Sequence, residues 1–164
     1  MAFFKRRRIE RAPNGAIRLR LPEGERALLR TLRAELQSLL DDNPSDPDLR
    51  RLFPPAHDDP EREAEYRGLV GAQLLAGRAR ALETLERTLD HGTLTADEAD
   101  AWLRALNDAR LVLGTRLDVT EDMDWDELDP SDPKTQELAV YAYLSWLQEQ
   151  LVEALAAGVD PTPP

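Results

Sequence analysis

The chain has 164 residues, a net charge of −11 at neutral pH and a hydrophobic share of 41%, which predicts one folded domain over residues 1–164. It contains no Cys and only two His, which excludes disulfides, thiolate metal sites and a cysteine nucleophile, and no cofactor is expected. No apolar run reaches the ~20 residues that a membrane span requires, so we expect a cytoplasmic protein with no membrane partner.

Charge is distributed unevenly along the chain. Residues 1–20 carry seven basic side chains and one acid, a balance of +6, which leaves −17 on the remainder. Eight acids and no Lys or Arg lie between Asp118 and Asp132. The pattern predicts a basic N-terminus on an acidic body.

The N-terminal segment 3–21 predicts a basic β-hairpin. Ile17, Leu19 and Leu21 alternate with Arg18 and Arg20, and the turn-forming residues 13–15 precede them. One face of the hairpin should be apolar and the other cationic.

The helical body, residues 22–157, should hold four helices. Helical spacing predicts them at about 23–41, 60–90, 95–117 and 133–157. Loops are expected at 42–60, where prolines accumulate, and at 118–133, and residues 158–164 should form a flexible tail. The predicted fold class is therefore mainly α, with about four helices in a bundle-like arrangement and an N-terminal β-hairpin.

The second predicted helix is long and has apolar or small residues at helical spacing: Tyr66, Val70, Leu74, Gly77, Ala81 and Leu85. It also contains glycines, which weaken a helix, so we expect close helix packing to compensate at these three positions: Gly68, Gly71 and Gly77.

The third predicted helix begins with the capping-box pair Thr95 and Glu98. Asn107 and Arg110 lie at the edge of its apolar stripe. The two residues either attach one of the long loops to the bundle or bind a partner. Asp108 should form a surface ion pair with Arg104, four residues away.

The fourth predicted helix places Tyr143 and Trp146 away from its main apolar stripe. Either the hairpin or the proline-rich loop covers these two rings, or they form a protein-binding or dimer surface, because exposed Trp and Tyr are typical interface anchors. We therefore regard Tyr143, Trp146, Asn107 and Arg110 as candidate partner-binding residues.

Two further chemistries are alternatives. The arginines of the hairpin could bind phosphates, which makes Arg6, Arg8, Arg18 and Arg20 a candidate basic patch for nucleic acid. The alternating acids of the 118–133 loop resemble a calcium loop, but Glu127 stands where its glycine belongs and Pro133 where its bidentate glutamate belongs. A metal-dependent enzyme using this loop is the weaker alternative, and no catalytic frame is present, so we expect no enzyme and no metal site.

Three motifs resemble one family. The segment 106–117 (LNDARLVLGTRL), supported by 51–56 (RLFPPA) and 146–149 (WLQE), resembles an actinobacterial family of unknown function, DUF2017, often encoded beside the ClpS protease adaptor. The resemblance implies a cytoplasmic, non-enzymatic regulator of oxidative-stress transcription that contacts a sigma factor. The redox-sensing form of that role uses a cysteine pair, and this chain has no cysteine, so thiol sensing does not carry over.

The sequence therefore predicts a regulatory protein that acts by protein–protein binding. Its partner would be a sigma factor or another component of transcription or proteolysis, or a second copy in a homodimer. Nucleic-acid binding through the basic hairpin is the alternative from a different class.

Overall fold

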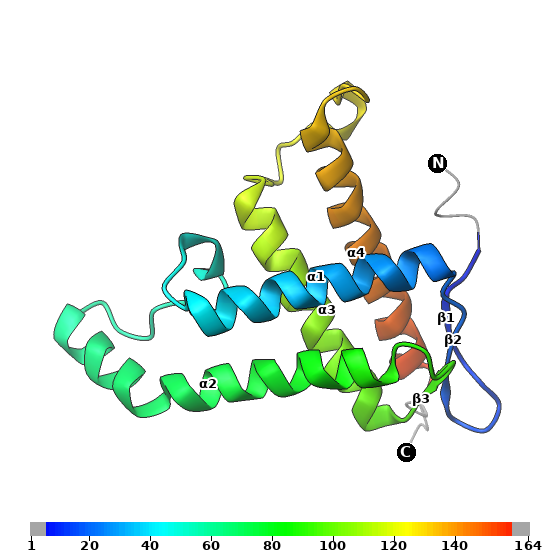
Figure 1. Ribbon diagram of the computed structural model, residues 1–164, viewed down its shortest axis with the longest axis horizontal. Coiled ribbons are helices and arrows are strands. Elements are labelled where there is room, and N and C mark those ends of the chain that lie inside the picture. The colour runs from blue at the N-terminus through cyan, green and yellow to red at the C-terminus, as the bar shows by residue number, and fades with distance from the viewer. Residues whose placement is uncertain (1–5, 159–164) are drawn as a thin grey trace, which may run out of the picture.

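The computed structural model describes residues 6–158, and four long helices dominate it (Figure 1). The mainly α fold predicted from the sequence is confirmed. The elements, in chain order, are β1 (Ile9–Arg11), β2 (Ile17–Leu19), α1 (Glu23–Asp42), the short 3-10 helix η2 (Pro47–Leu49), α2 (Pro60–Thr88), β3 (Thr93–Leu94), α3 (Ala96–Arg116), the 3-10 helix η3 (Trp125–Glu127) and α4 (Pro133–Ala156). Residues 3–5 of the expected hairpin and 159–164 of the expected tail lie outside this range.

The helices form two crossed layers. α1 and α2 run antiparallel side by side, and this pair crosses the antiparallel pair of α3 and α4 (Figure 1). The core lies where the layers meet and includes Leu29, Leu82, Trp102 and Leu144. The indole of Trp102 is fully buried and donates a hydrogen bond to the Thr88 hydroxyl at 2.7 Å, which satisfies its one polar group inside the core.

The predicted hairpin is present and gains a third strand. β1 pairs antiparallel with β2, with Ile9 opposite Leu19, and the turn uses Gly15 at φ +88°. β3 then pairs with β2, with Ile17 opposite Leu94. A strand of two residues is too short to show a period in the sequence, so only the fold reveals it.

Helix starts follow the capping rules. The capping box of Thr95 and Glu98 is confirmed in both directions, at 3.2 Å and 2.9 Å. Asp59 and Asp132 cap α2 and α4 with one hydrogen bond each, accepted from the backbone N–H two residues further on, and each precedes a proline at the first helical position. The ends of the helices therefore follow from local sequence.

The N-terminal part of α2, residues 60–80, projects from the body, and we call it the arm (Figure 1). Burial within α2 begins at Ala81, whereas Leu69 is 80% exposed and Leu74 is 40% exposed. The long helix predicted from the apolar spacing is therefore present, but only its C-terminal part is buried in the core.

The prediction that close packing compensates for the three glycines of α2 is wrong. A Cβ atom added at Gly68, Gly71 or Gly77 would meet no atom within 4 Å.

Within residues 6–158, no helix combines the length and apolar character of a membrane span.

Candidate partner-binding surfaces

The predicted aromatic surface is mostly covered by the chain itself. Tyr143 is only 4% exposed and Trp146 is half-buried, with ring centroids 6.1 Å apart. The guanidinium of Arg8 lies over the Trp146 ring, 5.8 Å from its centroid. The hairpin therefore covers this face, and the expectation that Tyr143 is an exposed anchor is corrected: its ring belongs to the core.

A polar cluster fixes the hairpin to α1 and α4. Arg8 forms an ion pair with buried Glu25 at 2.9 Å, and the side-chain oxygen of Gln150 accepts from the backbone N–H groups of Arg8 and Ile9 at 2.7 and 3.1 Å. Burial raises the pKa of the Tyr143 phenol, and a hydrogen bond to Glu25 raises it further. The cluster is structural, because each of these groups is paired within the chain.

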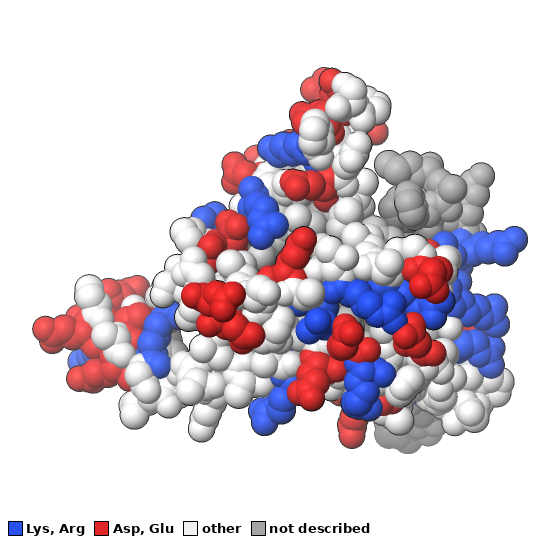
Figure 2. Space-filling model, in the orientation of Figure 1, with Lys and Arg blue, Asp and Glu red and all other residues white. Residues whose placement is uncertain are grey.

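The candidate basic patch is partly neutralised, because two carboxylates pair with three of its four arginines. Arg18 and Arg20 share Glu10, at 3.2 and 3.0 Å, while the half-buried Arg8 pairs with Glu25 as described. Arg6 is exposed. Basic side chains gather at the hairpin end of the molecule in Figure 2, but three of the four candidates already have a carboxylate partner. Nucleic-acid binding stays a prediction without added support from this geometry.

Asn107 and Arg110 connect two helices rather than attaching a loop. The Asn107 side-chain oxygen accepts hydrogen bonds from Arg110 at 3.2 Å and from Gln148 of α4 at 3.3 Å. Arg110 also lies 5.9 Å from the Tyr141 ring centroid. Both residues are half-buried in the α3–α4 contact, so they offer a partner only the edges of their side chains.

The acidic loop is held by an aromatic contact. Trp125 stacks on Tyr141 with centroids 6.2 Å apart and planes 14° from parallel. The loop acids are exposed, and Asp124, Asp129 and Asp132 accept hydrogen bonds from nearby backbone N–H groups. In the described part of the chain no group of three or more His, Asp or Glu side chains could hold a metal ion. The loop also lies far from the hairpin (Figure 1).

Asp108 was assigned to the surface from the sequence, and that assignment is wrong. It is 2% exposed and pairs with Arg78 of α2, which also donates to the Leu52 carbonyl at 2.7 Å and lies 5.2 Å from the Phe53 ring centroid. Burial raises the pKa of Asp108, and Arg78 offsets part of that rise. The sequence does contain a signal for this burial, because Asp108 lies on the same helical face as the small or apolar residues Ala101, Ala105 and Val112.

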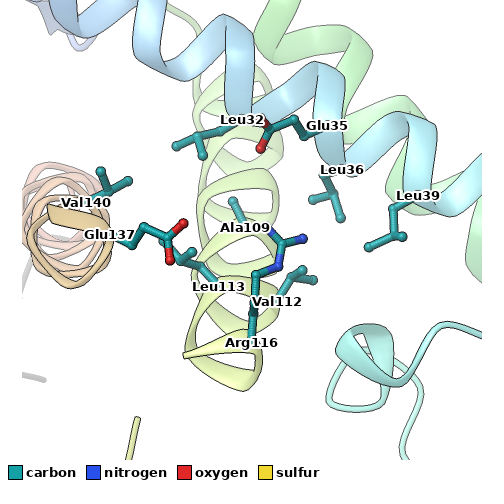
Figure 3. Close-up of a pocket in the computed structure, with 10 residues that line it drawn as sticks. All are labelled: Leu32, Glu35, Leu36, Leu39, Ala109, Val112, Leu113, Arg116, Glu137 and Val140. Carbon is teal, nitrogen blue, oxygen red and sulfur yellow. The ribbon is translucent and has the colours of Figure 1, made fainter. Parts of the chain in front are cut away.

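An open groove lies between α1 and α4, with α3 as its floor (Figure 3). It has a volume of about 110 Å³. Its walls are mostly aliphatic, and Glu35 and Glu137 stand at its rim. The aliphatic lining residues are Leu32, Leu36, Leu39, Ala109, Val112, Leu113 and Val140.

The charges at the groove differ in their pairing. Arg116 is engaged with Asp48 at 3.2 Å. Glu35 and Glu137 are exposed and take part in none of the ion pairs found among residues 6–158. The sequence analysis did not find this groove, because its residues come from three helices and meet only when the layers cross. The groove is thus mostly apolar inside, and two unpaired carboxylates lie at its edge together with Arg116, whose charge is paired with Asp48.

Comparison with known proteins finds curated relatives and a family model that match most of the chain. Relatives named "Oxidative stress regulator AosR" from Mycobacterium tuberculosis (strain H37Rv) and Mycobacterium bovis are each 30% identical over 189 residues, covering 91% of this chain and 86% of theirs. No solved structure matches. The profile described as "Domain of unknown function (DUF2017)" matches residues 5–155, so the chain belongs to the DUF2017 family.

Proposed function

We propose that this chain is a non-enzymatic, cytoplasmic regulatory protein of the stress response that acts by binding another protein. The names of its relatives support the regulatory role in oxidative stress. The proposed partner is a sigma factor or another component of transcription or proteolysis.

The groove between α1, α3 and α4 carries the proposal. A surface that is aliphatic inside and has carboxylates at its rim fits an amphipathic helix with aliphatic anchors and a flanking Lys or Arg. Glu35 and Glu137 are exposed and unpaired in the described chain, so a basic partner residue could bind them without displacing an internal contact. The surface needs no ligand other than a protein segment.

The chain does not respond to oxidation through a thiol of its own, because these 164 residues contain no cysteine. The oxidative signal would then act on the partner or on the amount of this protein. The regulated event in the proposal is therefore binding itself.

Direct titration of purified sigma factors from the same organism tests the proposal, with calorimetry as the readout. Replacing both rim acids, Glu35→Lys with Glu137→Lys, should weaken binding by about tenfold or more, because two attractive charge contacts become repulsive. The matched control is Glu127→Lys with Glu149→Lys, which makes the same charge change at exposed acids outside the groove.

The control should bind as the wild type does, and both variants should keep the helical circular dichroism of the wild type because all four sites are exposed. Equal binding by the rim variant and the wild type would remove the groove from the proposal. Absence of binding to every sigma factor, to RNA polymerase and to protease adaptors of the organism would contradict the proposed partner class.

A further inference from the structure

The outward face of the arm has the residue spacing of a helix–helix seam. Most of the arm is exposed, and one stripe of its exposed positions recurs every three or four residues, the spacing by which one helix packs along another. Leu69, 80% exposed, lies at the centre of this face beside the small residues Ala72 and Ala76. The full series is Arg62, Glu65, Leu69, Ala72, Gln73, Ala76, Arg80 and Glu83.

The four charged residues of the seam are unsatisfied within the chain. Arg62, Glu65, Arg80 and Glu83 are all exposed, and none of them belongs to an ion pair or side-chain hydrogen bond found among residues 6–158. The neighbouring Arg67 and Arg78, by contrast, pair with Glu63 and Asp108. These four unpaired charges lie together on the outward face.

Along the helix these four charges run basic, acidic, basic, acidic, and a second copy in the opposite direction presents the opposite charge at each position. If two arms lie antiparallel with a two-fold axis between Ala72 and Gln73, then Glu65 faces Arg80 of the other copy and Arg62 faces Glu83. A parallel pair in register would instead bring each charge against its own kind. The sequence of charges therefore selects the antiparallel arrangement.

The same symmetry matches shape. It places the large side chain of Leu69 opposite the small side chain of Ala76. The small residue leaves room for the leucine of the other copy.

We propose that a second copy of this chain binds along the arm, so that the two α2 helices form an antiparallel homodimer through the face centred on Leu69. The proposal is independent of the proposed function, because the groove lies between α1, α3 and α4, away from this face. A dimer built in this way would present two grooves.

Charge exchange in the full-length chain tests the pairing, with sedimentation velocity measured over a range of concentrations. Glu65→Arg alone places Arg against Arg at two symmetry-related contacts, and Arg80→Glu alone places Glu against Glu. Each single variant should raise the dimer dissociation constant by about tenfold or more. An equimolar mixture of the two variants restores both opposite-charge contacts and should return dimers of one copy of each.

An apolar pair of variants provides the matched control. Leu69→Gln should weaken the dimer, whereas Val152→Gln, at an exposed apolar residue of α4, should leave it unchanged. All substituted sites are exposed, so circular dichroism should report the wild-type fold for each variant.

Three results would overturn the proposal. One is a wild-type chain that sediments as a monomer up to ~1 mM, the limit of a weak but specific contact. The second is a pair of single variants that dimerise as the wild type does. The third is a mixture of those variants that stays monomeric while the wild type forms dimers.

Discussion

The arm and the shorter C-terminal part of α2 contain similar apolar residues and have opposite surroundings. In the C-terminal part Ala81, Leu82 and Leu85 are 2–4% exposed, whereas in the arm Leu69 is 80% and Leu74 is 40% exposed. The difference arises because α1 and α3 pack along the C-terminal part of α2 and do not reach the start of the arm (Figure 1). Apolar spacing predicts that a face will seek cover, and the reach of neighbouring helices decides whether the same chain supplies it.

Arg78 lies near the boundary between the arm and the buried C-terminal part of α2. Its guanidinium contacts Asp108 of α3 and the carbonyl of Leu52 in the proline-rich loop. Several residues on its N-terminal side are exposed, and two contact the loop: Arg67 donates a hydrogen bond to the Phe53 carbonyl, and the Glu63 carboxylate accepts from the backbone N–H groups of Ala56 and His57. Substitutions at and around this point test where the body ends and the arm begins.

The largest effect is expected for Arg78→Met. The change leaves the buried Asp108 carboxylate without its charge partner and should lower the free energy of unfolding by about 2–4 kcal/mol, as measured by urea denaturation. The matched control is Arg104→Met, at the exposed residue that the sequence pattern had paired with Asp108; a change within about 0.5 kcal/mol is expected there. An equal loss of unfolding free energy in the two variants would contradict the assignment of Arg78, rather than Arg104, as the partner of Asp108.

Glycine substitutions should give opposite signs in body and arm. A Cβ at Gly114 would lie 2.9 Å from Cε2 of Tyr141, so Gly114→Ala should lower the free energy of unfolding by about 1–3 kcal/mol. Gly68→Ala fills open space and should raise it by about 0.5–1 kcal/mol through helix propensity. Thermal unfolding of dilute protein measures both, and a loss of stability at Gly68 would show packing that the fold does not contain.

The smallest effect is a pH dependence at the boundary. The pKa of Asp108 is raised by burial, so the folded state holds this proton more tightly than the unfolded state. The contribution of Asp108 to stability is therefore greatest at low pH and falls as pH rises from the ordinary pKa of 3.8 through the raised value.

Comparison with Asp108→Asn, which cannot titrate, isolates this contribution. The unfolding free energy of the wild type minus that of the variant should decrease as the pH rises from 3 toward 7 (values chosen to bracket the ordinary Asp range). A difference that increases over this interval would show that Arg78 outweighs burial and lowers the pKa instead.

Local patterns predicted the elements well. The hairpin, the four helices and the capping box of Thr95 and Glu98 were all confirmed, with helix bounds that differ from prediction by only a few residues. Each of these features depends on residues close together in the chain. Strands show apolar residues at every second position, helices show them at every third or fourth position, and the capping box joins two residues three positions apart. The family was likewise recognisable from contiguous motifs.

Contacts between elements that are distant in the sequence were not predicted in the same way. The carboxylate of Asp108 finds Arg78, thirty residues earlier, instead of the nearby Arg104, and the Tyr143 face is covered by a hairpin from the other end of the chain. The two alternatives weighed for Tyr143 and Trp146 could not be separated by spacing alone, because a helical face looks the same whether a strand, a loop or a partner covers it.

Secondary structure and its boundaries were thus decided by the sequence, because propensity, periodicity and capping act over a few residues. The groove, the buried Arg78–Asp108 pair and the uncovered arm were decided only by the crossing of the two helical layers. The crossing determines how far each helix is covered by its neighbours. It therefore determines which apolar and charged side chains remain exposed and available to another molecule.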